Sequence, residues 1–204
     1  ISMDMKKTTL CIFLGIWGVI PILKAQTIAP EALQIKTAVL SAPLEKQEHA
    51  TVYGYSQEGK FVLLREGNND LVCLADNPKQ AGIQTSCYFK ELEPFMARGR
   101  ALAEQGKNPK QVTDIRDAEI KSGALELPMQ PTTLYVYWGA EDQLNPETGE
   151  VAGAQSRYVV YIPFATSAST GLPNKPDKPG MPWIMDEGTH KAHIMINPVK
   201  VEPK

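Results

Sequence analysis

The sequence predicts an α+β fold: a mainly antiparallel β-sheet with two to three helices packed on one face and long loops rich in proline and glycine. Two observations favour this class. Runs of β-branched and aromatic residues form one group before and one group after a pair of helical patterns, an order typical of α+β domains. The chain also contains 16 prolines among 204 residues, which disfavours an all-helical fold because proline disrupts helix interiors.

The N-terminal residues have the order of a secretory signal peptide. Lys6 and Lys7 form a short basic region, residues 10–23 form an apolar run, and Ala25 supplies a small residue at the expected cleavage site. As a helix the run would reach only about 21 Å, short of the roughly 30 Å hydrocarbon core of a bilayer. The alternative is an uncleaved anchor, because Leu23 stands where cleavage sites prefer a small residue.

The expected organisation is a signal peptide over residues 1–25, a single globular domain over residues 26–198 and a disordered tail over residues 199–204. Without the three lysines and one aspartate of the signal peptide, the 21 basic and 23 acidic residues become 18 and 22, a formal net charge of −4. A mildly acidic chain is a poor candidate for binding nucleic acid or an anionic membrane. We expect a periplasmic or secreted protein with no membrane span after cleavage.

Two cysteines, Cys73 and Cys87, remain after residues 1–25 are removed. A pair of cysteines in an exported protein predicts a disulfide, and closing a loop of about 15 residues contributes roughly 3 kcal/mol in the chain-entropy model. A redox-active or nucleophilic thiol is the alternative, but no Cys-x-x-Cys motif supports it.

The elements of the first half begin with a helix over residues 28–40. Alternating apolar residues predict strands over residues 51–55 and 60–65, joined by a turn that contains Gly59. A third strand over residues 71–74 completes an expected antiparallel meander.

Two helices are expected in the middle of the chain. Apolar residues at helical spacing predict the first over residues 91–105, with Gly106 as its stop. Asn108 and Gln111 have the spacing of a capping box and predict the start of the second helix, which should end near Gly123.

The last part of the chain predicts strands over residues 132–138, 157–162 and 193–196. A turn over residues 145–149 separates the first two. Residues 167–182 are rich in Pro, Gly and Ser and predict an extended loop.

Two histidines, His190 and His193, suggest a metal site at first sight. However, His193 lies in a predicted strand, and residues three apart in a strand point to opposite faces. No acidic residue nearby completes a zinc pattern. We therefore assign no metal, and interpret His190 as a turn residue and His193 as hydrogen-bonded at the sheet edge.

Two further kinds of site are weighed and not assigned. Ser167 or Ser169 with His193 and Asp186 has the residue types of a serine hydrolase, but no G-x-S-x-G context surrounds either serine. The Asn and Asp residues within residues 68–77 could bind calcium, but their spacing is not that of an EF-hand. No catalytic residue and no cofactor is assigned.

Aromatic residues give the candidate ligand-binding site. Trp138, Tyr161 and Trp183, together with His193, could line an apolar pocket with polar tips. Ordinary core packing is the alternative, because pocket and core use the same residue types.

Two blocks of residues carry a resemblance. One is Leu64-Arg65-Glu66-Gly67-Asn68 followed by Cys73, Asp76 and Cys87; the other is Pro182-Trp183-Ile184-Met185 followed by Gly188-Thr189 and Ala192-His193-Ile194-Met195. Together they resemble a family of uncharacterised exported bacterial proteins, over residues 50–198. The resemblance implies a single exported domain and carries no activity. It also implies that position 190 varies, which leaves His193 the stronger candidate.

The leading hypothesis is a non-enzymatic periplasmic or secreted domain that binds a small molecule or a protein. One alternative is a hydrolase or metal-dependent enzyme around His193, with Asp186 or Glu187. A structural envelope-associated protein is the other.

Cleavage of the signal peptide is directly testable. N-terminal sequencing of the protein exported by a bacterial host should begin near Gln26, because Ala25 precedes the expected cut. A chain that still carries residues 10–23 would instead identify an anchor.

Overall fold

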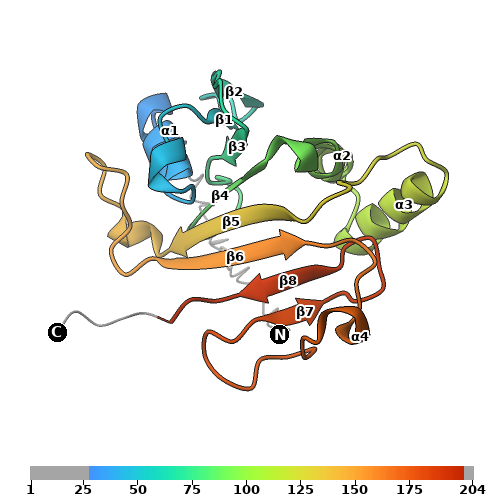
Figure 1. Ribbon diagram of the computed structural model, residues 1–204. Helices are drawn as coiled ribbons and strands as arrows, with labels where there is room; N and C mark the ends of the chain where they lie inside the picture. The colour runs from blue at the N-terminus through green and yellow to red at the C-terminus, as the bar shows by residue number, and fades with distance from the viewer. Residues whose placement is uncertain (1–27, 200–204) are drawn as a thin grey trace, which may run out of the picture.

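The computed structural model describes residues 28–199, which form an eight-stranded sheet flanked by helices (Figure 1). The strand order is β2-β1-β3-β4-β5-β6-β8-β7, and every neighbouring pair except β1 and β3 is antiparallel. The predicted α+β class is confirmed. The expected signal peptide and residues 200–204 of the expected tail lie outside the described residues.

The predicted helices and strands occur in the predicted order, and the structure adds a strand over residues 83–89 that the sequence did not predict. The described helices are α1 (Glu31–Val39), α2 (Glu93–Glu104), α3 (Pro109–Lys121) and α4 (Ser167–Thr170), with 3-10 helices η1 (Leu44–Lys46), η2 (Lys90–Leu92) and η3 (Glu141–Gln143). The strands are β1 (Thr51–Tyr55), β2 (Phe61–Arg65), β3 (Leu71–Leu74), β4 (Ile83–Phe89), β5 (Thr132–Gly139), β6 (Gln155–Tyr161), β7 (Trp183–Met185) and β8 (His193–Ile196).

The first three strands do not form the expected meander. β1 and β2 form the predicted hairpin, but β3 lies on the other side of β1 and runs parallel to it. The chain after β2 passes the start of β1, where the amides of Asn68 and Asn69 donate to the carbonyl of His49. Gly67 permits this crossing, because a Cβ there would lie 2.3 Å from the Ala50 carbonyl carbon.

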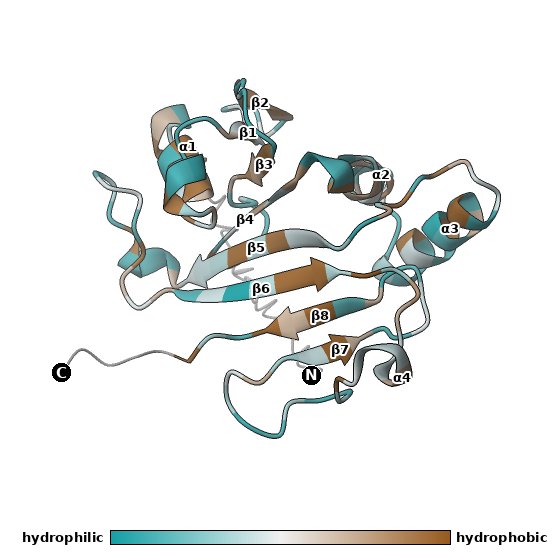
Figure 2. Ribbon diagram, viewed as in Figure 1, coloured by the Kyte–Doolittle hydropathy of each residue, from teal (hydrophilic) through white to brown (hydrophobic). Residues whose placement is uncertain are grey.

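The helices cover both faces of the sheet, and the expectation that they pack on one face is wrong. Ala38 and Val39 of α1 pack in one core cluster with Cys73. The second cluster contains Val72 of β3, and Met96 of α2 packs against it. Neighbouring residues of a strand point to opposite faces, so α1 and α2 lie on opposite sides. Apolar segments of β5, β6 and β8 supply the middle of the sheet (Figure 2).

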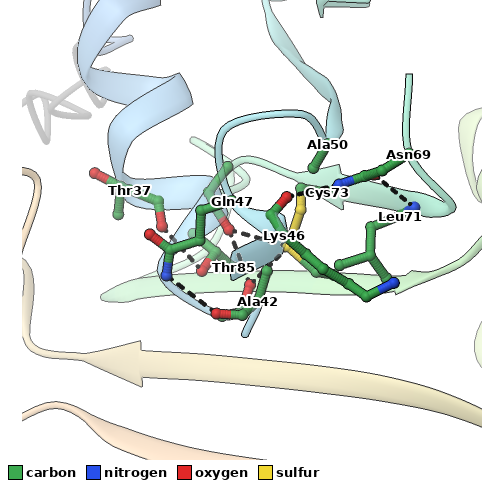
Figure 3. Close-up of a disulfide and its surroundings, with 12 residues drawn as sticks. Thr37, Ala42, Lys46, Gln47, Ala50, Asn69, Leu71, Cys73 and Thr85 are labelled. Carbon is green, nitrogen blue, oxygen red and sulfur yellow. Dashed lines mark hydrogen bonds between the residues drawn. A yellow bond between two sulfur atoms is a disulfide. The ribbon is translucent and has the colours of Figure 1, made fainter. Parts of the chain in front are cut away.

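The predicted disulfide joins Cys73 and Cys87, which are directly paired residues of β3 and β4. Both cysteines are fully buried, and the Ser41 hydroxyl lies 3.2 Å from Cys87 Sγ. Figure 3 shows the bond beneath the end of α1, with Thr37 and Thr85 hydrogen-bonded nearby. The disulfide therefore cross-links β3 and β4 on the face of the sheet that α1 covers.

Local signals predicted the middle helices well. Asn108 and Gln111 form the predicted reciprocal capping box at the start of α3. The expected loop over residues 167–182 is only partly irregular, because it begins with α4, which has a capping box of its own between Thr166 and Ser169. β7 was also missed, since three residues have too little pattern to predict a strand.

Removing the disulfide should lower stability without changing the fold. In the double variant Cys73→Ala, Cys87→Ala, we expect the free energy of unfolding to fall by about 3 kcal/mol. The two cysteines are 14 residues apart in the chain, and without the disulfide the unfolded chain regains the conformational freedom of that loop. Urea titration of the oxidised wild type and the variant measures this. Equal midpoints in the two proteins would contradict the assigned role.

Candidate functional site

Three of the four residues predicted to bind a ligand lie on one face of the sheet by register. β5 and β6 pair Thr132 with Tyr161, and β6 and β8 pair Tyr161 with His193. Directly paired residues point to the same face. Trp138 shares that face, because it lies an even number of residues along β5 from Thr132.

Trp183 completes the set on β7. It pairs with Met195, which lies two residues along β8 from His193, so its side chain joins the same face. The four residues do not form one pocket, however. Trp183 packs against the core cluster around Met195, and Trp138 pairs with Gln155 at the end of β6 that is opposite to Tyr161.

Tyr161 and His193 belong to a compact group that we call the histidine cluster: Phe95, Arg116, Tyr161, His190 and His193. The rings of Tyr161 and His193 lie 5.5 Å apart between centroids, and the ring of Phe95 lies 5.9 Å from those of Tyr161 and His190. Burial raises the pKa of Tyr161. The cluster therefore joins α2, α3, β6 and β8 at one point.

Arg116 brings a cation into this cluster. Its guanidinium carbon lies 3.9 Å from the ring centroid of Phe95, and Nη1 donates to the Phe95 carbonyl at 3.2 Å. Burial lowers the pKa of Arg116, although a guanidinium stays charged at any ordinary pH. Within residues 28–199, its buried Nε has no hydrogen-bond partner. Arg116 thus attaches α3 to α2 through an aromatic face.

His190 is the cluster residue that sequence reasoning underestimated. It is only 2 % exposed, and its Nδ1 lies 3.3 Å from Asp117 Oδ1. Burial lowers the pKa of His190, and its Nε2 has no hydrogen-bond partner in the described chain. The Thr-His-Lys turn carries no signal of this burial, because α3 packs over it from more than 70 residues away.

His193 matches the sequence interpretation more closely. Its Nδ1 lies 2.7 Å from the carbonyl oxygen of Lys191, which gives the ring a backbone partner at the start of β8. No group of three or more His, Cys, Asp or Glu residues that could hold a metal occurs within residues 28–199. The two histidines therefore have different hydrogen-bond partners, Asp117 for His190 and the Lys191 carbonyl for His193.

The residues of the hydrolase alternative have other partners. Ser169 Oγ accepts from the amide of Thr166 within the α4 capping box, and Ser167 is hydrogen-bonded to Asn174 and Glu187. Asp186 forms an ion pair of 3.2 Å with Lys191. These serines therefore stabilise α4 and its loop in the structure described.

The polar residues considered for calcium serve turns and ion pairs. Asn69 accepts from the amide of Leu71, and Asp70 pairs with Lys46 at 2.6 Å. Asp76 lines a cavity of about 90 Å³ under α1, and burial raises its pKa. That volume lies well below the roughly 300 Å³ at which ligand pockets begin.

An apolar groove of about 830 Å³ adjoins the histidine cluster. Its walls are Ile120 at the end of α3, residues 125–131 and residues 162–165. Ile120 lies four residues after Arg116 in α3, and residue 162 directly follows Tyr161 at the end of β6, so these two walls of the groove are continuous in the chain with the cluster. Glu126 and Gln130 supply the polar side chains of this lining.

Two large apolar side chains of the groove face solvent. Met129 is 94 % exposed and Phe164 is 56 % exposed. Phe164 also has a left-handed backbone with φ of 63°, which costs a bulky residue about 1–2 kcal/mol. Its amide donates to the Thr189 carbonyl at 2.8 Å, so the turn that carries His190 holds this wall in place.

Comparisons with protein-family models, with curated proteins and with solved structures returned no match. Within residues 28–199, none of the helices has the length and hydrophobicity that crossing a bilayer requires. The candidate site is therefore defined by its geometry alone.

The buried His190 predicts a pH dependence of stability. The unfolded chain takes up a proton on this side chain near pH 6.5, whereas the folded protein, with the lowered pKa, resists protonation. The unfolded state then binds more protons, so the free energy of unfolding should fall as the pH falls from 7 to 5, by up to about 1.4 kcal/mol per pH unit.

Urea titrations at several pH values measure this dependence. The variant His190→Asn should lack this part of the slope, and the exposed His49 supplies a matched control in His49→Asn, which should keep it. Parallel pH profiles for the wild type and His190→Asn would contradict the assignment.

Proposed function

We propose that this chain is an exported, non-enzymatic domain that binds an apolar segment of a protein partner in the groove beside the histidine cluster. The observation that carries the proposal is the exposure of Met129 and Phe164 on one apolar groove. Exposed apolar residues that are scattered singly need no explanation, but those that line a common groove are typical of interaction sites.

The backbone of Phe164 supports the same conclusion. A residue held in a costly left-handed conformation persists only when its surroundings over-determine it, and such residues concentrate at functional sites. Here the hydrogen bond to Thr189 holds the conformation while the ring stays half exposed. Met129 adds a flexible side chain that adapts to the shape of a partner.

The lining favours a polypeptide over a small molecule. Small-molecule pockets bury most of their ligand and orient it with several placed polar groups. This groove offers Glu126 and Gln130 as polar side chains, and its lip carries the exposed Met129. An apolar polypeptide segment gains affinity from burial alone, at about 25 cal/mol per Å² of apolar surface.

Export of the domain is part of the proposal. The N-terminal pattern of Lys6, Lys7 and an apolar run supports it. The Cys73–Cys87 disulfide also supports it, because such bonds persist mainly in oxidising compartments.

Fluorescein-labelled peptides of ten residues test the proposal. Each apolar peptide is matched by a copy with aspartate at its central position, and binding is followed by fluorescence polarisation. We expect apolar peptides to bind and their aspartate copies to bind at least tenfold more weakly. Met129→Glu and Phe164→Asn should each weaken binding at least tenfold, because they remove apolar area from the groove.

Leu44→Glu is the matched control, because Leu44 is 83 % exposed and does not line the groove. It should leave binding unchanged. Phe164→Asn should change the free energy of unfolding by less than about 1 kcal/mol, because asparagine tolerates the left-handed backbone and this relief offsets the lost burial of the ring. Equal binding by the groove variants and the control would refute the proposal.

A further inference from the structure

The sheet face that carries the four predicted residues extends beyond the part covered by α2. Tyr88 of β4, Leu134 and Val159 are buried on it, whereas Gln84 and Gln155 are exposed on either side of Trp138. Figure 2 shows the same change along β6, which is hydrophilic at its start and hydrophobic at its end. We call this part the open end: Gln84, Ser86, Val136, Trp138, Gln155 and Arg157.

Arg157 is fixed in place at the open end by two contacts. Its guanidinium carbon lies 5.0 Å from the ring centroid of Trp138, and its Nε donates to Asn197 Oδ1 at 2.8 Å. Stacking and the Nε hydrogen bond together restrict the plane of the group. Among the described residues, Arg157 forms no ion pair with a carboxylate.

The other described arginines each use at least one Nη group in a structural contact, which sets Arg157 apart. Arg98 and Arg100 form ion pairs with Glu119 and Glu93. Arg65 donates to the backbone of the segment between η1 and β1, and Arg116 to the backbone of α2. Within residues 28–199, Arg157 is hydrogen-bonded through Nε alone, and this leaves the edge formed by its two Nη groups for a further acceptor.

We propose that the open end binds an organic carboxylate, with its two oxygens on the Nη groups of Arg157 and its body against Trp138. A guanidinium whose plane is already fixed matches a carboxylate through two parallel hydrogen bonds. Arg157 is the one charged residue among the six of the open end, and a single positive charge suits a monoanion better than a doubly charged phosphate. Gln84 and Gln155 supply amides for the polar groups of the ligand.

Two sources can supply this carboxylate. One is a free small acid. The other is the chain itself, because Glu202 follows Asn197 by five residues, and five residues span at most about 17 Å. Glu202 lies outside the described residues, so the experiment includes a variant that distinguishes the two sources.

Titration of the full mature protein with sodium benzoate, followed by NMR of the Trp138 indole N–H and the Arg157 Nε–H, tests the site. Benzamide is the matched probe, because it has the same ring without the negative charge. Benzoate should shift both signals in a saturable way, and benzamide should shift them at least tenfold more weakly. Higher salt should weaken the benzoate response, as expected for a charged pair.

Variants identify the contacts. In the Trp138 signal, Arg157→Gln should abolish the response, and Arg157→Lys should weaken it at least fivefold, since lysine keeps the charge but loses the paired donors. Asn197→Ala should weaken it severalfold while all charges remain, which keeps the test valid if Arg157→Gln does not fold. Lys107→Gln removes an exposed charge in the turn between α2 and α3 and should leave the response unchanged.

The benzoate titrations of the wild type and of Glu202→Gln distinguish the two sources of the carboxylate. A response in the wild type assigns the site to a free acid, and a response only in Glu202→Gln assigns it to the carboxylate of the chain itself. No response in either protein, or equal responses to benzoate and benzamide, would overturn the proposal. Phe164→Asn should not alter the benzoate response, so this test is independent of the proposed peptide groove.

Discussion

The pairing of β5 with β6 is the constraint on which the rest of the sheet depends. It runs over seven residue pairs, from Thr132 with Tyr161 to Trp138 with Gln155. A slip of one residue would move every side chain of one strand to the opposite face, and would remove Leu134 and Val159 from the core that they share. Burial of Leu134 and Val159 therefore selects the register of β5 and β6. That register puts Tyr161 and Trp138 on the same face of the sheet, at opposite ends of the strand pair.

The same register determines which aromatic side chains lie at the two ends of this sheet face, and with them the surroundings of two arginines. At one end of the face, α2 and α3 cover Tyr161, and the cation of Arg116 is enclosed against Phe95. At the other end, Arg157 lies against Trp138 with its Nε anchored. These two arginine–aromatic contacts thus have different surroundings. One contributes to helix packing and the other remains available to a ligand.

Predictions from the sequence succeeded where the determining contacts are local. The Asn108 capping box, the Gly59 turn and the cysteine pair involve residues that are close in the chain or have few possible partners. They failed where distant segments decide the outcome. The position of β3 beside β1 depends on the crossing at Gly67, and the division of helices between two faces depends on how α1 packs.

In the candidate site, too, the sequence predicted the features that depend on local patterns and missed those that depend on distant segments. Residue type and strand patterning indicated Tyr161 and His193 as candidate residues, and the register then brought them together. The burial of His190 requires α3, and the groove requires the left-handed backbone of Phe164. Neither feature has a local pattern, because each arises from contacts between segments far apart in the chain.

The attachment of α3 has a consequence for the motions of the molecule. This helix contains no fully buried residue, and its polar and cation–π contacts with the rest of the fold include the Arg98–Glu119 ion pair, the contact of Arg116 with Phe95 and the approach of Asp117 to His190. Segments with few buried apolar contacts open at a lower free energy than the whole domain. We expect α3 to detach as a cooperative unit in native-state hydrogen exchange, exposing Phe95 and widening the groove while the sheet stays folded.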